Sequence, residues 1–128
     1  MKALVVEDNL VDATRCVSLL KELGATEIDA VGTVAAALLR LDDVAERKLP
    51  APDVMILDLA FPFESGFEVL RRWRADPELR KIRIIVWTQM GETEQRLCGL
   101  FGVHKVVPKW AGYKELEQAL RASAASVG

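Results

Sequence analysis

Residue types that can take part in chemistry follow the ends of short apolar runs in this 128-residue sequence. In chain order these residues are Glu7, Asp8, Asp58, Thr88 and Lys109. The apolar runs predict parallel strands, and the carboxyl ends of parallel strands meet at one edge of a sheet. We therefore expect three carboxylates, one hydroxyl and one ammonium to converge at that edge.

Three neighbouring carboxylates repel one another unless protons or a cation offset their charge. Oxygen ligands without a nearby His or Cys favour a hard ion, with Mg²⁺ ahead of any transition metal. A carboxylate that touches Mg²⁺ near a lysine can attack phosphorus and form an aspartyl phosphate. The metal and the ammonium would then offset charge on the phosphoryl oxygens, and the hydroxyl would donate a hydrogen bond to one of them.

Short apolar runs alternate with amphipathic stretches along the chain. The predicted strands lie near 3–6, 27–31, 54–57, 82–87 and 103–107. The predicted helices lie at 10–23, at 33–47 with Thr33 as the cap, from about 67 to 73, at 92–101, and from 113 onward. Strict alternation of five such units predicts an α/β fold with a doubly wound five-stranded parallel sheet. We interpret Asp12 as a helix-start acid, Asp53 as a turn residue and His104 as a surface residue.

Length and composition predict one domain over 1–128, with a core at about 2–122 and a short frayed tail. The net charge of −2 argues against nucleic acid or an anionic membrane as the main partner. Cys16 and Cys98 have no metal-type spacing and indicate a reducing compartment. No apolar run is long enough for a signal peptide or a membrane span, so we expect a cytoplasmic protein.

Four segments together resemble the signatures of bacterial response-regulator receiver domains, in the order and spacing of that family. They are Val5-Val6-Glu7-Asp8-Asn9, Ile56-Leu57-Asp58-Leu59 followed by Pro62 and Gly66, Ile85-Val86-Trp87-Thr88, and Val106-Val107-Pro108-Lys109. The resemblance covers essentially the whole chain and implies the strand order 2-1-3-4-5. It also implies a phosphoacceptor with slow self-dephosphorylation rather than a conventional enzyme.

The resemblance assigns a role to each matching position. Asp58 would be phosphorylated by a histidine kinase or a histidine phosphotransfer protein. Glu7, Asp8 and Asp58 would hold Mg²⁺ together with the backbone carbonyl of Ala60. Thr88 and Lys109 would contact the phosphoryl oxygens. The output would be a changed face around the fourth helix, fifth strand and fifth helix, in a stand-alone receiver that acts on a protein target. Homodimer formation and onward phosphoryl transfer are left open.

The sequence departs from the family pattern around the lysine and the hydroxyl. Trp110 follows Lys109 where relatives have proline, so we expect a trans bond there. Val106 stands where relatives often carry a Tyr or Phe that rotates on activation. Gln89, after the hydroxyl, is long enough to cover part of the site. We expect Trp110 to be exposed, on a partner surface with Leu97, Leu100 and Phe101.

Three other functions remain as alternatives. A phosphatase of the haloacid-dehalogenase type would need a second Asp two residues after Asp58, where Ala60 stands. A flavodoxin-like flavin carrier would need a phosphate cradle after the first strand, where Glu7 and Asp8 would repel phosphate. A receiver-like module that binds partners without phosphorylation is the third alternative.

Overall fold

The computed structural model describes residues 1–127, and side chains as far as Ala124, as a five-stranded parallel sheet between helices. The strands are β1 (Lys2–Val6), β2 (Glu27–Val31), β3 (Val54–Leu57), β4 (Arg83–Thr88) and β5 (Lys105–Pro108). Their order is β2-β1-β3-β4-β5, and every neighbouring pair is parallel. The predicted fold class and strand order are confirmed.

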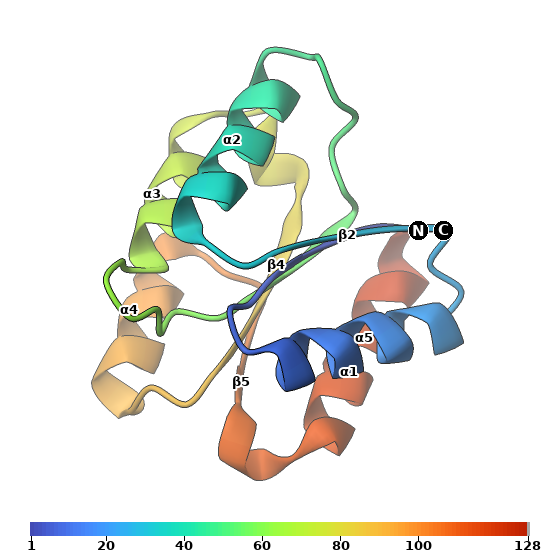
Figure 1. Ribbon diagram of the computed structural model, residues 1–128, viewed down its shortest axis with the longest axis vertical. Coiled ribbons are helices and arrows are strands. Elements are labelled where there is room, and N and C mark those ends of the chain that lie inside the picture. Colours follow the sequence, from blue (N-terminus) through green and yellow to red (C-terminus); the bar gives the residue numbers. More distant parts are fainter. Residues whose placement is uncertain (128) are drawn as a thin grey trace.

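The helices cover both faces of the sheet. They are α1 (Leu10–Glu22), α2 (Val34–Ala45), α3 (Phe67–Ala75), α4 (Glu92–Phe101) and α5 (Tyr113–Val127), with single 3₁₀ turns at Leu79–Lys81 and Lys109–Ala111. Figure 1 shows α2, α3 and α4 on one side of the sheet and α1 with α5 on the other. A chain that starts in the middle of the sheet and winds in both directions produces this arrangement when its crossovers are right-handed.

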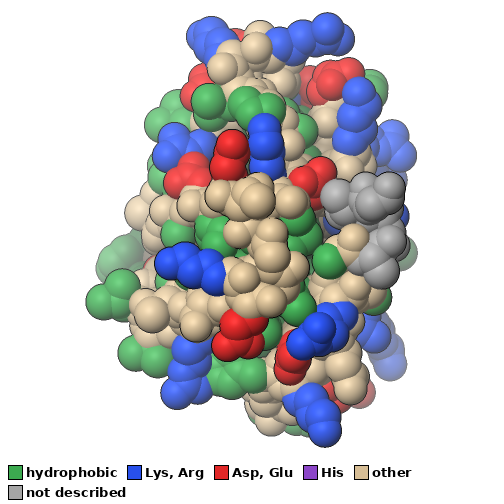
Figure 2. Space-filling model, turned by 90° about the vertical axis from the view of Figure 1, so that its right-hand side faces the viewer, with side chains coloured by type: hydrophobic (Ala, Val, Ile, Leu, Met, Phe, Trp, Pro, Cys, Tyr) green, Lys and Arg blue, Asp and Glu red, His purple; other side chains and the backbone are tan. Residues whose placement is uncertain are grey.

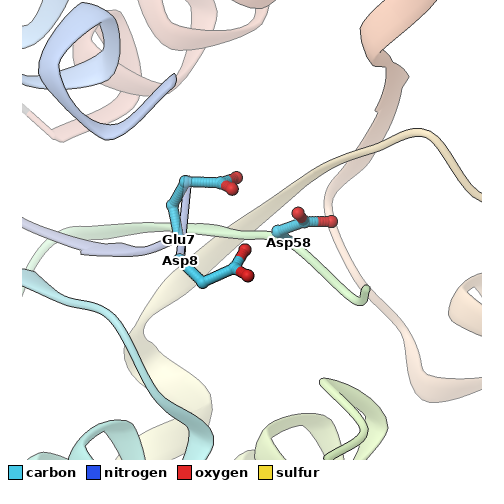
Figure 3. Close-up of side chains that lie close together, drawn as sticks. All are labelled: Glu7, Asp8 and Asp58. Atoms are coloured by element: carbon cyan, nitrogen blue, oxygen red, sulfur yellow. The ribbon is translucent and has the colours of Figure 1, made fainter. Parts of the chain in front are cut away.

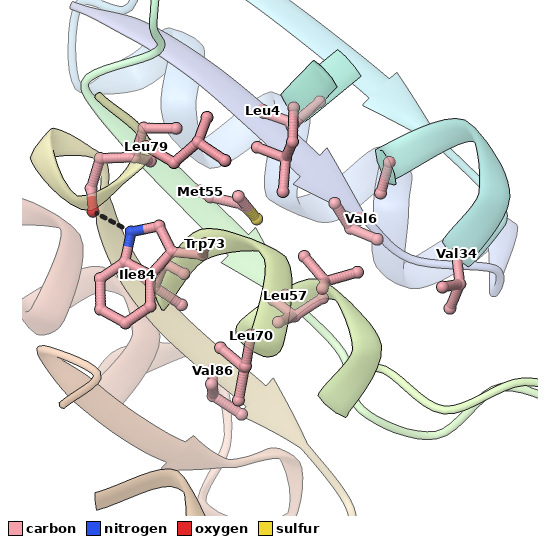
Figure 4. Packing of buried hydrophobic residues seen from close by; sticks show 14 of the residues in the cluster. Leu4, Val6, Val34, Met55, Leu57, Leu70, Trp73, Leu79, Ile84 and Val86 are labelled. Carbon is pink, nitrogen blue, oxygen red and sulfur yellow. Dashed lines mark hydrogen bonds between the residues drawn. The ribbon is translucent and has the colours of Figure 1, made fainter. Parts of the chain in front are cut away.

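Each face of the sheet packs a hydrophobic cluster. On the side of α2 and α3, the Trp73 side chain lies 4% exposed and donates its indole N–H to the Ile82 carbonyl at 3.0 Å (Figure 4). On the side of α1 and α5, Cys16 and Leu20 pack with Trp87 and Leu116. Because β3 and β4 are covered on both faces, their sequences are nearly continuous apolar runs rather than alternating ones.

The predicted start of α2 and the predicted end of α5 can be compared with the structure. The Thr33 side chain accepts the Ala36 N–H at 3.0 Å, which confirms it as the cap of α2. The helix α5 continues to Val127 and Ser123 is 6% exposed, so helical backbone extends past residue 122, while the domain bounds stay a prediction. Alanine, the strongest helix former, supplies much of this last stretch and explains its helical backbone. The predicted tail residue Gly128 lies outside the described residues.

Charge on one face and the hydropathy of the helices both bear on the kinds of partner that the sequence argues against. On the face that Figure 2 shows, Lys and Arg side chains are interspersed with Asp and Glu side chains. Within 1–127, none of the helices combines the length and the apolar character that crossing a bilayer requires.

The loop that follows β3 folds back over its own start and depends on Gly66. The Gly66 N–H donates to the Leu59 carbonyl at 3.1 Å. A Cβ atom at this position would lie 2.6 Å from both the Asp58 carbonyl oxygen and the Leu59 Cα. Since Gly66 has an ordinary φ of −60°, lack of space rather than backbone conformation requires glycine here.

We expect Gly66→Ala to lower the free energy of unfolding by about 1–3 kcal/mol, because its methyl group must displace backbone. Urea denaturation measures the change. The matched control is Gly99→Ala in α4, where an added Cβ meets nothing within 4 Å. The control should keep or raise stability, by up to about 1 kcal/mol, because alanine favours the helix. Equal stability of the two variants would contradict the close approach.

Candidate functional site

Three of the predicted carboxylates meet at the carboxyl edge of the sheet. Glu7 and Asp8 follow β1, and Asp58 follows β3, which is paired with β1. The pairing is extended by one more bond, from the Asp58 N–H to the Val6 carbonyl at 3.0 Å. Ligand oxygens of the three side chains lie within 4.8 Å of one another. Figure 3 shows the carboxylates of Glu7 and Asp8 extending from the end of β1 toward the side on which Asp58 lies.

Burial gives these carboxylates unequal environments. Glu7 and Asp58 are each 4% exposed, whereas Asp8 is open to solvent. Burial raises the pKa of Glu7 to about 7, and the charge of Asp58 adds to the rise although the hydrogen bond from Lys109 opposes it. Near neutral pH the negative charge on the buried carboxylates is therefore only partly compensated, and a bound cation would stabilise their charged forms.

Lys109 reaches into this cluster from the far end of the chain. Its Nζ lies 2.9 Å from Glu7 Oε2 and 3.2 Å from Asp58 Oδ2. Burial acts to lower the pKa of Lys109, but hydrogen bonds to Asp12 and Glu7 and the nearby charges outweigh it and raise the pKa above its ordinary value. The amine is therefore a permanent ammonium at physiological pH.

Asp12 is a site residue that the sequence interpretation missed. Its Oδ2 accepts from Lys109 Nζ at 2.8 Å, the shortest of the three lysine contacts. Its Oδ1 accepts from the Tyr113 hydroxyl at 3.4 Å. Asp12 lies in the first turn of α1, as predicted, but the sequence interpretation did not include its contacts with Lys109 and Tyr113. The available signal was its place in the first turn of the helix that starts at this edge.

Ala60 is hydrogen-bonded to one of the carboxylates, whereas Thr88 is hydrogen-bonded to the backbone of the next loop. Thr88 is fully buried, and its Oγ1 accepts the Met90 N–H at 3.3 Å. Ala60 donates its backbone N–H to Asp58 Oδ1 at 3.1 Å. A polar hollow lies over the cluster and is lined by Glu7, Asp8, Asn9, Asp12, Asp58, Ala60, Gln89 and Lys109. Thr88 is not among the lining residues, whereas Gln89 borders the hollow as expected.

The bond after Lys109 and the exposure of Trp110 agree with the expectations from the sequence. No peptide bond within 1–127 is cis, so Lys109 and Trp110 are joined by a trans bond. Trp110 is 80% exposed, and Val106 is half-buried against the cluster on the α3 side. Trp87 is buried, with its ring centroid 4.8 Å from Lys109 Nζ and its indole nitrogen without a hydrogen-bond partner among the described residues.

Two residues predicted to lie outside the site do so. Asp53 precedes β3, at the opposite end of that strand from Asp58, and its Oδ2 accepts the Lys2 N–H at 2.8 Å. His104 is exposed, and its Nδ1 accepts the Ile84 N–H at 3.2 Å.

The donor set fits a hard divalent cation. Three carboxylates contact a single ammonium. Glu7, Asp8 and Asp58, whose ligand atoms lie within 4.8 Å of one another, offer only oxygen atoms. Mg²⁺ binds such sites through one or two carboxylates and keeps several waters, which an exposed ligand such as Asp8 permits. Glu7, Asp8 and Asp58 are therefore the residues that would hold it.

We expect Mg²⁺ to stabilise the protein by about 1.4 kcal/mol at ten times its dissociation constant, because it binds only the folded state. The midpoint of thermal unfolding should rise by a few degrees. In Asp8→Asn this rise should be lost or strongly reduced, since an exposed ligand is removed without disturbing the core. Asp43→Asn, on α2, is the control and should keep the full rise. An undiminished response of Asp8→Asn would exclude this carboxylate as a ligand.

Comparison with known proteins finds one family across nearly the whole chain. The family model described as "response regulator receiver domain" matches residues 3–121. The phosphate regulon transcriptional regulatory protein PhoB of Rhizobium meliloti (strain 1021) is 40% identical over 75 residues, which are 57% of this chain and 33% of that protein. Hybrid signal transduction histidine kinase D of Dictyostelium discoideum is 35% identical over 72 residues, which are 56% of this chain and 4% of that protein. The chain thus spans a third or less of these curated relatives.

Solved structures of similar proteins share the fold over their full length. The response regulator protein TrrA of Thermotoga maritima, in complex with Mg²⁺ and BeF, superposes with a TM-score of 0.77 at 26% identity over 96% of this chain and 99% of that one. The receiver domain of sensor histidine kinase PA1611 of Pseudomonas aeruginosa, with magnesium in its active-site cleft, has a TM-score of 0.77 at 26% identity over 97% of each chain.

Proposed function

The chain belongs to the response regulator receiver domain family, and on that premise we propose that it is a phosphoacceptor switch whose Asp58 receives a phosphoryl group in a Mg²⁺-dependent reaction. The observation that carries the proposal is the Lys109 ammonium, 3.2 Å from Asp58 within a cluster of carboxylates suited to a divalent cation. A nucleophile, a fixed cation and oxygen ligands at one edge are the parts that aspartyl phosphate formation requires.

The chain's own residues prepare Asp58 for in-line attack. The Ala60 N–H holds Oδ1 at 3.1 Å and so fixes the plane of the carboxylate. One Asp58 oxygen attacks phosphorus and forms a P–O bond as the P–N bond of a phosphohistidine donor breaks. The electron pair of that bond leaves on the imidazole nitrogen, which takes up a proton. The Lys109 ammonium stays beside the acceptor and offsets charge on the transferring oxygens.

Bound Mg²⁺, held by Glu7, Asp8, Asp58 and the Ala60 carbonyl, would neutralise charge on the phosphoryl oxygens. The TrrA and PA1611 structures with this ion, at a similar fold, support the assignment.

We infer that the phosphoryl donor is a histidine kinase or a histidine phosphotransfer protein. A hybrid histidine kinase and a sensor histidine kinase are among the similar proteins, and both carry segments that match this chain. The face around α4, β5 and α5 is proposed as the output surface. It exposes Leu97 by 42%, Leu100 by 72% and Trp110 by 80%, and exposed apolar side chains of this size support its assignment as an interaction surface.

The alternatives have weaker support. A phosphatase would need an acid or base beside the nucleophile, and position 60 offers only an alanine side chain. A flavin phosphate would meet Glu7 and Asp8 at the end of β1, where its charge would be repelled. A module that works without phosphorylation would have no use for a buried lysine held against the acceptor carboxylate.

The direct test is mass spectrometry of the protein after incubation with acetyl phosphate and Mg²⁺. We expect the mass of one phosphoryl group to be added to the wild type and to be absent from Asp58→Asn. Asp53→Asn is a matched control, because the same residue type lies at the other end of β3. It should be modified as the wild type is. An unmodified wild type that remains folded, tested with several donors, would refute the proposed function.

Removal of the ammonium should slow phosphorylation without preventing the fold. We expect Lys109→Ala to reduce the rate of phosphorylation by acetyl phosphate by roughly 10²–10³-fold, the usual cost of losing one group that stabilises transition-state charge. The rate is followed by separating the two forms on phosphate-affinity gels. Lys105→Ala, an exposed lysine on β5, is the control and should react at the wild-type rate. A wild-type rate for Lys109→Ala would remove the lysine from the mechanism.

A further inference from the structure

The donors of Lys109 are fully committed in the structure. A lysine ammonium carries three N–H donors. Lys109 Nζ has three acceptors, with Asp12 at 2.8 Å, Glu7 at 2.9 Å and Asp58 at 3.2 Å. The side chain is only 8% exposed, so its head group has little access to solvent. Each donor therefore has a carboxylate partner.

Phosphorylation adds a further acceptor at the same place. In the proposed function a phosphoryl oxygen on Asp58 needs a hydrogen bond from Lys109. The phosphorylated Asp58 oxygen loses its charge, but the phosphoryl group that replaces it offers three oxygens and nearly two negative charges, so it draws the Lys109 ammonium more strongly than the carboxylate did. As the ammonium moves toward the phosphoryl oxygens, its contact with Glu7 or with Asp12 is weakened.

The burial of the carboxylates decides which of these two contacts gives way. The Glu7 and Asp58 side chains are 2% and 5% exposed, whereas the Asp12 side chain is 21% exposed. A carboxylate that loses its partner is destabilised least where water can solvate it. Asp12 has another partner as well, because its Oδ1 accepts from the Tyr113 hydroxyl at 3.4 Å. Asp12 is the acceptor that can be released at the lowest cost.

We propose that Asp12 is a positioning residue that competes with the phosphoryl group for the Lys109 ammonium. This inference rests on the proposed function of Asp58. In the resting protein Asp12 holds the lysine between α1 and the acceptor. When a phosphoryl group occupies Asp58, the lysine turns to it and Asp12 is left to water and Tyr113. The competition lowers the affinity of the site for a phosphoryl group and couples its occupancy to the first residue of α5.

The test measures the affinity for beryllofluoride, a phosphoryl stand-in, at saturating Mg²⁺ by isothermal titration calorimetry. We expect Asp12→Ala to bind it about fivefold or more tightly than the wild type, because no charge-assisted hydrogen bond has to be given up. Asp12→Asn should lie between the two, because its amide oxygen still accepts from the lysine but carries no charge. A residue with a merely structural role would give weaker binding when replaced.

The graded series also separates competition from simple charge repulsion. If Asp12 acted only through its negative charge, Asn and Ala would raise the affinity equally, and that result would overturn the proposal. Glu115→Ala is the matched control, because it removes an exposed acid from the first turn of α5. Its affinity should equal that of the wild type. Urea denaturation of each variant without Mg²⁺ shows that the compared proteins are folded.

The result also distinguishes this inference from the function on which it rests. A folded wild type that binds no beryllofluoride and is not phosphorylated would refute the proposed function. A wild type that binds beryllofluoride, with Asp12→Ala binding it equally or more weakly, would overturn the role of Asp12 and leave Asp58 as the acceptor.

Discussion

The structure of this edge is governed by one charge balance, in which a buried ammonium lies against carboxylates that would otherwise repel one another. Lys109 contacts Glu7, Asp12 and Asp58, and two of these three are almost completely removed from water. One cation cannot neutralise this cluster, and burial leaves the pKa of Glu7 near 7. This deficit of positive charge is the physical basis of the proposed binding of a metal ion and of the proposed phosphorylation.

The fold supplies the precision that this balance needs. The register of β1 against β3 pairs Val6 with Leu57 and so places the next residues, Glu7 and Asp58, side by side. The loop after β3 returns over its own backbone at Gly66, which leaves no room for a side chain there. Lys109 arrives from the end of β5, two strands away from β3 in the sheet. Backbone pairing thus fixes the relative positions of site residues that are distant in sequence.

The features that follow from the hydrophobic periodicity of the chain could be predicted from the sequence. The positions of strands, the sheet order through family resemblance, and the convergence of Glu7, Asp8 and Asp58 were predicted because acids at strand ends follow the topology. Asp12 was not, because its contact with Lys109 joins residues 97 positions apart and depends on how α1 and the lysine loop approach each other. The end of α5 was also missed, since a run of small residues resembles a tail until its backbone is seen to remain helical.

Trp87 gives the molecule an internal optical probe. Its ring is 2% exposed, lies 4.8 Å from the Lys109 ammonium and has its centroid 5.3 Å from that of the Tyr113 ring. A positive charge so close to an indole shifts the energy of its excited state, and a dry environment keeps that shift free from solvent relaxation. A movement of the ammonium of the kind proposed above would therefore change the wavelength and intensity of the Trp87 emission, which needs no added label.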